Sequence, residues 1–233
     1  MSRARSGLGV VTGLAVEASC LPGAVGRDGP SVCCAGVGPV AAASAASALL
    51  DAGCRALLSF GCAGGLDPRL ASGAVLVATE IIELDGRLTV TDGDWQSRLL
   101  AMLQGIGAPV FPGRLLGSDR PLVSAAEKQR RGREFDALGV DMESHAVARI
   151  ASAAGVPMLA VRAICDTAEM SLPEWLDDVI DDAGRPRTLI VLSRLLMHPS
   201  DTARVLRLAG NQRAALSALR GVALRVGGLF ALD

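Results

Sequence analysis

Short apolar runs alternate with longer helical patterns over most of the chain. Several of the short runs are apolar throughout, as strands covered on both faces are. The predicted strands are Leu8–Thr12, Val32–Ala35, Ala56–Phe60, Ala74–Ile82, Gly113–Leu116 and Met158–Ala163. The predicted helices between them are Pro39–Asp51, Asp94–Leu103, Ser124–Phe135 and Met142–Ala154. This alternation predicts an α/β fold, a three-layer α/β/α sandwich with a mainly parallel or mixed central sheet.

From Leu172 onward the pattern is entirely helical. Pro173 suits the start of a helix or helix pair that runs to about Met197, and a further helix is predicted over Asp201–Leu229. Arginines alternate with Leu and Val in that last stretch. This suits a helix packed on the sheet or at a subunit interface, or a basic amphipathic helix that touches a membrane. We expect one domain, residues 1–233, with a helical C-terminal extension from about residue 199.

The composition narrows the function classes. Half of the 233 residues are hydrophobic, 20% are charged and the net charge is −1, which argues against disorder. With 3% aromatic residues and no Tyr, the chain offers neither a phosphate-tracking surface nor a stacking platform. We therefore expect no nucleic-acid partner. Lys128 is the only lysine among 23 basic residues, which we interpret as a coding bias.

Targeting signals and cysteine spacing favour the cytoplasm. No apolar run reaches the roughly 20 residues of a membrane-spanning helix. The apolar stretch up to Cys20 contains Glu17 and several glycines, which fits a secretory signal poorly. The six cysteines (20, 33, 34, 54, 62 and 165) lie in apolar surroundings without C-x-x-C spacing. We expect them to be free thiols in a reducing compartment.

Glycines and acids gather where the predicted strands end, the usual place for a site in an open α/β sheet. The segments are Val11–Glu17, a glycine-rich turn at Ser59–Leu66, Gly139–Ser144 and Arg162–Glu169. Taken singly, Asp166 could cap a turn, Glu143 could favour a helix dipole and Glu17 could be solvated. Their occurrence together, in this order, favours a ligand site.

The arrangement resembles the nucleoside phosphorylase and nucleosidase superfamily over roughly residues 8–190. The most specific segments are Gly61–Leu66, Val140–Glu143 and Arg162–Asp166. The opening Val11–Glu17 and the helical tail look most like the hopanoid-associated phosphorylase branch. That branch is implied to release adenine from adenosylhopane. The resemblance also implies a homo-oligomer, a dimer or larger.

The resemblance implies a role for each matching residue. Asp166 would be the catalytic acid that donates a proton to purine N7, and desolvation at an apolar strand end would keep it protonated. Glu17 would orient or deprotonate the attacking water. Glu143 would accept hydrogen bonds from the ribose hydroxyls, with Met142 beneath the sugar. The other expected substrate contacts are Cys62, Ala63, Gly64, Pro121 and Leu122.

Departures from the family pattern favour water over phosphate as the nucleophile. No arginine precedes Gly61, where the phosphorylases use one to hold phosphate, and the carboxylate of Glu17 would repel phosphate. Cys62 replaces the serine of the nucleosidases, and Asp119–Val123 replaces their base-stacking aromatic. We expect no cofactor and no metal, with phosphate as the alternative co-substrate.

A hopanoid substrate would carry a large rigid hydrocarbon at the ribose 5′ side. Its pocket must open toward an apolar channel or a membrane. We therefore expect a cytoplasmic protein in peripheral contact with the inner face of the membrane, with an adenosylated lipid or a purine nucleoside as its ligand.

Other interpretations stay open. Gly36–Ala41 matches the dinucleotide fingerprint but lacks its partner acid. A nucleophile elbow at Cys62, with His145 or His198 as base, would need glycine where Phe60 stands. Two isolated histidines give no metal-ligand spacing. Within the superfamily, the alternatives are a methylthioadenosine/S-adenosylhomocysteine nucleosidase and another purine nucleoside phosphorylase. The non-enzymatic alternative is a nucleoside-binding protein.

Overall fold

The computed structural model describes residues 7–21, 29–173, 202–227, 230 and 232. Its elements are β1 (Leu8–Thr12), α1 (Ala15–Ala18), β2 (Ser31–Cys34), α2 (Pro39–Asp51), β3 (Ala56–Gly65), β4 (Val75–Glu83), β5 (Leu88–Val90), α3 (Gly93–Met102), β6 (Val110–Gly117), α4 (Ala125–Phe135), β7 (Gly139–Asp141), α5 (Ser144–Ala154), β8 (Met158–Asp166) and α7 (Thr202–Val226). The helix predicted from Pro173 to about Met197 lies outside the described residues, apart from Pro173 itself. Residues 1–6, where the stretch compared with a secretory signal begins, lie outside them as well.

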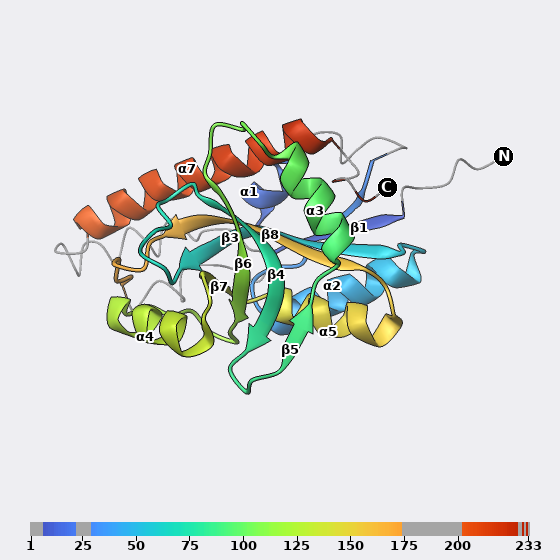
Figure 1. Cartoon of the computed structure of the whole chain (residues 1–233), viewed down its shortest axis with the longest axis horizontal. Coiled ribbons are helices and arrows are strands. Elements are labelled where there is room, and N and C mark those ends of the chain that lie inside the picture. Colours follow the sequence, from blue (N-terminus) through green and yellow to red (C-terminus); the bar gives the residue numbers. More distant parts are fainter. Residues whose placement is uncertain (1–6, 22–28, 174–201, 228–229, 231, 233) are drawn as a thin grey trace.

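The strands form one mixed sheet between two layers of helices (Figure 1). Strands β2, β1, β3 and β8 run parallel to one another, as do β4, β6 and β7. The two sets meet in antiparallel pairs, β3 with β7 and β4 with β8, which closes these strands into a ring. Helices α1, α3 and α7 cover one side of the sheet, and α2, α4 and α5 cover the other. The predicted sandwich with a mixed sheet is confirmed.

Strand β3 runs to Gly65, five residues beyond its predicted end at Phe60. The expected glycine-rich turn is therefore wrong, since this segment pairs with β8 and then with β7. A Cβ at Gly61 would lie 2.5 Å from Nη1 of Arg162 and 2.8 Å from the carboxyl carbon of Glu17. Here glycine makes room for charged side chains beside a strand and does not mark a turn.

The remaining differences from the predicted elements are short ones. The sequence pattern missed α1, β5 and β7, which have three or four residues each and are too short to show a period. Strand β8 continues through Cys165 to Asp166. Helix α5 begins at Ser144, two residues later than predicted, where the Ser144 N–H donates to Oδ2 of Asp141 over 3.1 Å.

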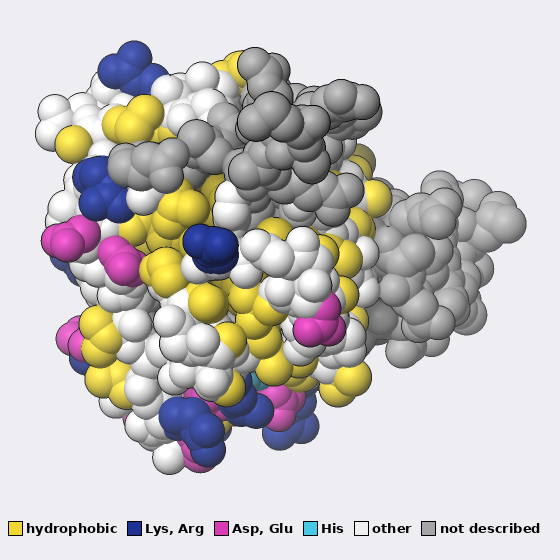
Figure 2. Space-filling view, turned by 90° about the vertical axis from the view of Figure 1, so that its right-hand side faces the viewer, with side chains coloured by type: hydrophobic (Ala, Val, Ile, Leu, Met, Phe, Trp, Pro, Cys, Tyr) yellow, Lys and Arg dark blue, Asp and Glu magenta, His cyan; other side chains and the backbone are white. Residues whose placement is uncertain are grey.

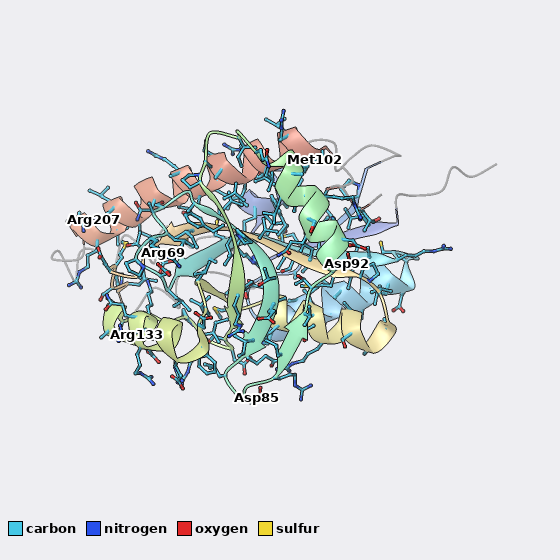
Figure 3. All side chains as sticks on the ribbon, in the orientation of Figure 1. Arg69, Asp85, Asp92, Met102, Arg133 and Arg207 are labelled. Atoms are coloured by element: carbon cyan, nitrogen blue, oxygen red, sulfur yellow. The ribbon has the colours of Figure 1, made fainter. Side chains whose placement is uncertain are left out.

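Helix α7 packs along the sheet, chiefly against β8. Its inward residues Ala215, Leu219 and Val222 are fully buried in the same apolar cluster as Phe60 of β3. At its C-terminal end α7 lies beside Met102 of α3 (Figure 3), whose carbonyl oxygen accepts from Nε of Arg225 over 2.9 Å. Of the helices among the described residues, none is long and apolar enough to cross a membrane.

We predict that Leu219→Ala lowers the free energy of unfolding by about 3 kcal/mol, because it leaves a cavity between α7 and the sheet. Leu224→Ala on the same helix is the matched control, since Leu224 is 71% exposed and its loss changes stability by less than about 0.5 kcal/mol. Urea unfolding of both variants measures the difference. Equal effects would show that the buried face of α7 does not contribute to the core.

Candidate active site

One pocket collects every residue that the sequence assigned to the site. It lies where β3, β7 and β8 end, next to α1 and the start of α2. The predicted residues that line it are Glu17, Cys62, Ala63, Gly64, Pro121, Leu122, Met142, Glu143 and Asp166. Residues that were not singled out for the lining complete it: Gly13, Leu14, Val37, Arg120, Val140, Asp141, Cys165 and Leu172.

Glu17 is a buried carboxylate held by the backbone. Its Oε2 accepts the N–H groups of Gly13 (3.1 Å) and Leu14 (2.9 Å), and its Oε1 accepts the N–H of Cys62 (2.7 Å). It is 3% exposed, so the solvated alternative is wrong. Burial raises the pKa of Glu17, against the lowering influence of Arg162 and of the N–H groups of Cys62 and Leu14. A fixed carboxyl with a raised pKa suits a general base.

Arg162 lies behind the pocket and is 1% exposed. Its guanidinium forms an ion pair with Asp141 and lies 3.6 Å from Oε2 of Glu143. Its Nη2 also donates to Oγ of Ser59 (2.7 Å) and of Ser144 (3.0 Å). Burial alone would lower the pKa of Arg162, but the surrounding carboxylates outweigh it and raise the pKa. Arg162 therefore stays charged and compensates the acids at this end of the pocket.

Glu143 is 7% exposed at the start of α5, where its Oε1 accepts the N–H of Gly38 over 3.1 Å. Burial raises the pKa of Glu143 to about 7, opposed by Arg162 and reinforced by Asp141 and Glu17. Glu143 thus exchanges its proton near neutral pH. The glycine-rich segment Gly36–Ala41 therefore directs a backbone N–H, that of Gly38, at the carboxylate of Glu143. This contact explains the segment without a dinucleotide pyrophosphate.

Asp166 sits in a different environment from the apolar one that was expected. The ammonium group of Lys128 forms an ion pair with its Oδ2, and the thiol of Cys165 donates to its Oδ1 over 3.1 Å. The carboxyl group is thus held by a buried cation and a thiol, and not by apolar packing alone. Periodicity could not reveal this partner, because Lys128 is 38 residues away in the chain, on α4.

The cysteine and histidine alternatives find little support in this geometry. The elbow alternative placed the nucleophile at Cys62, but Cys62 lies inside β3 and pairs with Ala163 of β8, so it does not stand on the strand-to-helix turn that an elbow requires. His145 points elsewhere, with Nε2 3.0 Å from Oδ1 of Asp119, and is absent from the pocket lining. His198 lies outside the described residues. Within the described part of the chain, no group of three His, Cys, Asp or Glu side chains could hold a metal ion.

Comparison with known proteins gives the family. Residues 20–196 match the profile of the phosphorylase superfamily, so the chain belongs to this superfamily. Glu143 and Asp166 lie within the matched residues, and Glu17 lies just before them. The 5′-methylthioadenosine/S-adenosylhomocysteine nucleosidase of Treponema pallidum is 32% identical over 176 residues. The match covers 58% of this chain and 65% of that protein, less than two thirds of its length.

Solved structures show the same fold. The 5′-methylthioadenosine/S-adenosylhomocysteine nucleosidase of Helicobacter pylori superposes with a TM-score of 0.71 at 16% identity, covering 96% of this chain and 99% of that one. The futalosine hydrolase of the same organism superposes with a TM-score of 0.67 at 16% identity, covering 92% and 96%. The sandwich described above is thus the fold of these nucleosidases.

The raised pKa of Glu143 predicts a pH-dependent stability. Because its folded pKa of about 7 lies above the ordinary value of 4.5, its contribution to stability is full below pH 4.5 and is lost as the pH rises through 7. Relative to Glu143→Gln, the wild type should lose on the order of 3 kcal/mol of unfolding free energy over this range. Urea unfolding at a series of pH values measures it, with the surface variant Glu127→Gln as control. Parallel curves for wild type and Glu143→Gln would contradict the prediction.

Proposed function

We propose that this chain is an enzyme that cleaves the N-glycosidic bond of an adenosyl compound by hydrolysis and releases adenine. The observation that carries the proposal is the convergence of Glu17, Glu143 and Asp166 on one pocket. Breaking this bond leaves positive charge on the ribose and negative charge on the purine. Carboxylates at the sugar and a proton at the base serve those two charges. The names of the relatives, nucleosidases and a futalosine hydrolase, support the same class.

The geometry suggests how the residues divide this work. Glu17, held by three backbone N–H groups, takes the proton of the attacking water. Glu143 accepts the ribose hydroxyls, and Met142 packs beneath the sugar. Asp166 delivers a proton to N7 of the leaving purine. The remaining contacts to the substrate come from Cys62, Ala63, Gly64, Pro121 and Leu122, through backbone groups and apolar packing.

The charges around the pocket favour water over phosphate. Its lining includes the acids Glu17, Asp141, Glu143 and Asp166, and Arg120 as a basic residue. Arg162 reaches the neighbourhood of Gly61 but is already paired with carboxylates. A phosphate dianion would therefore meet repulsion near the sugar. No cofactor is needed for this reaction, and phosphate stays the alternative co-substrate.

For the substrate we propose adenosylhopane, cleaved during hopanoid biosynthesis. Leu14, Val37 and Leu172 line the pocket, and Val40, 81% exposed, follows Val37 in the first turn of α2. Such apolar side chains suit a large hydrocarbon at the ribose 5′ position. The second candidate is methylthioadenosine or S-adenosylhomocysteine, which the 32% identity to the Treponema pallidum nucleosidase favours.

The molecular surface supports two further parts of the proposal, a homo-oligomer and peripheral membrane contact at the inner face. Figure 2 views the molecule from the right-hand side of Figure 1. Hydrophobic side chains gather near the centre of this face, and most charged groups lie toward its edges. Leu206 and Leu224 are exposed on α7 beside exposed arginines. Arg207 lies near the N-terminal end of this helix (Figure 3). Such a mixed face suits anionic headgroups.

The purified protein should release adenine from adenosylhopane, at a rate that does not depend on phosphate. Chromatographic detection of adenine, with methylthioadenosine as the second substrate and with phosphate present or absent, measures both points. Release from methylthioadenosine alone would replace the hopanoid assignment by the second candidate. A phosphate requirement would refute hydrolysis, and release from neither substrate would favour a nucleoside-binding protein.

Substitution of the pocket acids should lower the turnover rate, whereas substitution of an acid on the surface should not. Glu17→Gln and Asp166→Asn should each lower kcat by about 100-fold or more, because each removes a proton transfer in the reaction. Glu134→Gln, on the exposed side of α4, is the control and should keep the wild-type rate. Near-normal adenine release by either active-site variant would refute the role given to that residue.

A further inference from the structure

Lys128 is the only lysine of the sequence, and it is completely buried. Every other basic side chain apart from the two histidines is an arginine. On the same helix, α4, Arg130 is 57% exposed and pairs with glutamates at the surface. A lysine is almost never fully buried without a partner. The one lysine therefore stands at a place where its charge has a specific use.

The three N–H groups of the Lys128 ammonium each have an acceptor. Nζ donates to Oδ2 of Asp166, to the carbonyl oxygen of Met170 over 2.9 Å and to that of Thr167 over 3.3 Å. An ammonium group has three donors and no acceptor, so this cage matches its charged form. Asp166 in turn lines the pocket, and Lys128 is the charged proton donor in direct contact with its Oδ2.

Lysine and arginine differ in one respect that matters here. Both hold a carboxylate by charge, but the guanidinium of arginine does not release its proton in proteins, whereas the ammonium of lysine can. A chain that otherwise uses arginine has lysine at the single buried position behind the proposed acid. This choice is explained if the group must give up a proton as well as carry a charge.

We propose that Lys128 is a positioning residue that supplies the proton which Asp166 passes to the leaving purine. The inference rests on the proposed N-glycosidic cleavage and deepens it. As the C1′–N9 bond breaks, its electron pair moves onto the purine and N7 takes a proton from Asp166. Asp166 takes one from the Lys128 ammonium. Water adds its hydroxyl to C1′ and gives its proton to Glu17. After adenine leaves, the proton held by Glu17 returns to Lys128 through pocket water and Asp166, which restores both carboxylates and the ammonium group.

A substrate that needs no proton on its leaving group tests this role. Nitrophenolate leaves without protonation, so p-nitrophenyl ribofuranoside is the probe beside methylthioadenosine. Lys128→Met and Lys128→Arg should both lower kcat for adenine release by about 100-fold with little change in KM. Both should cleave the nitrophenyl probe within about 5-fold of wild type. Arg130→Met, on the exposed side of the same helix, is the control and should match the wild type on both substrates.

A double variant covers the case in which Lys128→Met alone fails to fold. Lys128→Met/Asp166→Asn removes both charges of the pair, and it should release adenine at the rate of Asp166→Asn, because Lys128 acts only through Asp166. Wild-type adenine release by Lys128→Arg, or equal losses on both substrates, would overturn the inference and leave the proposed function intact. A wild-type protein that releases adenine from no adenosyl compound would overturn both.

Discussion

The ion pair between Arg162 and Asp141 is the interaction on which the pocket depends. Both side chains are 1% exposed, and a buried charge without a partner costs several kcal/mol. Arg162 belongs to β8, Asp141 to β7, and the hydroxyls that complete the shell come from β3 and α5. Three strands that are not all neighbours in the sheet are thereby tied to one point. Gly61 lets this happen, because any larger residue would occupy the space of the guanidinium.

A second buried cation stands at the other end of the pocket, and the two differ in kind. Arg162 is surrounded by carboxylates and hydroxyls and keeps its charge. Lys128 is surrounded by one carboxylate and two carbonyl oxygens. At the Arg162 end the cation keeps its charge, while burial raises the pKa values of Glu17 and Glu143. The proposed proton transfer is placed at the Lys128 end, where negative charge would develop on the base.

The sequence predicted the layers and the residues around the pocket, and it missed what holds them. Strand β1 and helix α2 have their predicted bounds, because an apolar run and a long helical pattern are local signals. Glu17, Glu143 and Asp166 could be found because strand ends converge in this kind of sheet. Their partners could not. The pairing of Lys128 with Asp166 joins α4 to β8, and neither the periodicity nor the spacing of either segment carries information about it. Arg162 offered a signal, a charge inside an otherwise apolar strand, that indicates a buried counter-ion.

The closed ring formed by β3, β8, β4, β6 and β7 has a consequence for how such a protein can diverge. The acids and their cations sit on the ring or against it, where most substitutions disturb several partners at once. Val37, Arg120 and Leu172, by contrast, reach the pocket from segments between the helices and strands. Insertions and replacements in those segments leave the ring intact. Natural variation can therefore change which molecule enters while inheriting the same reaction, and the rim is where related chains with different metabolic roles should differ most.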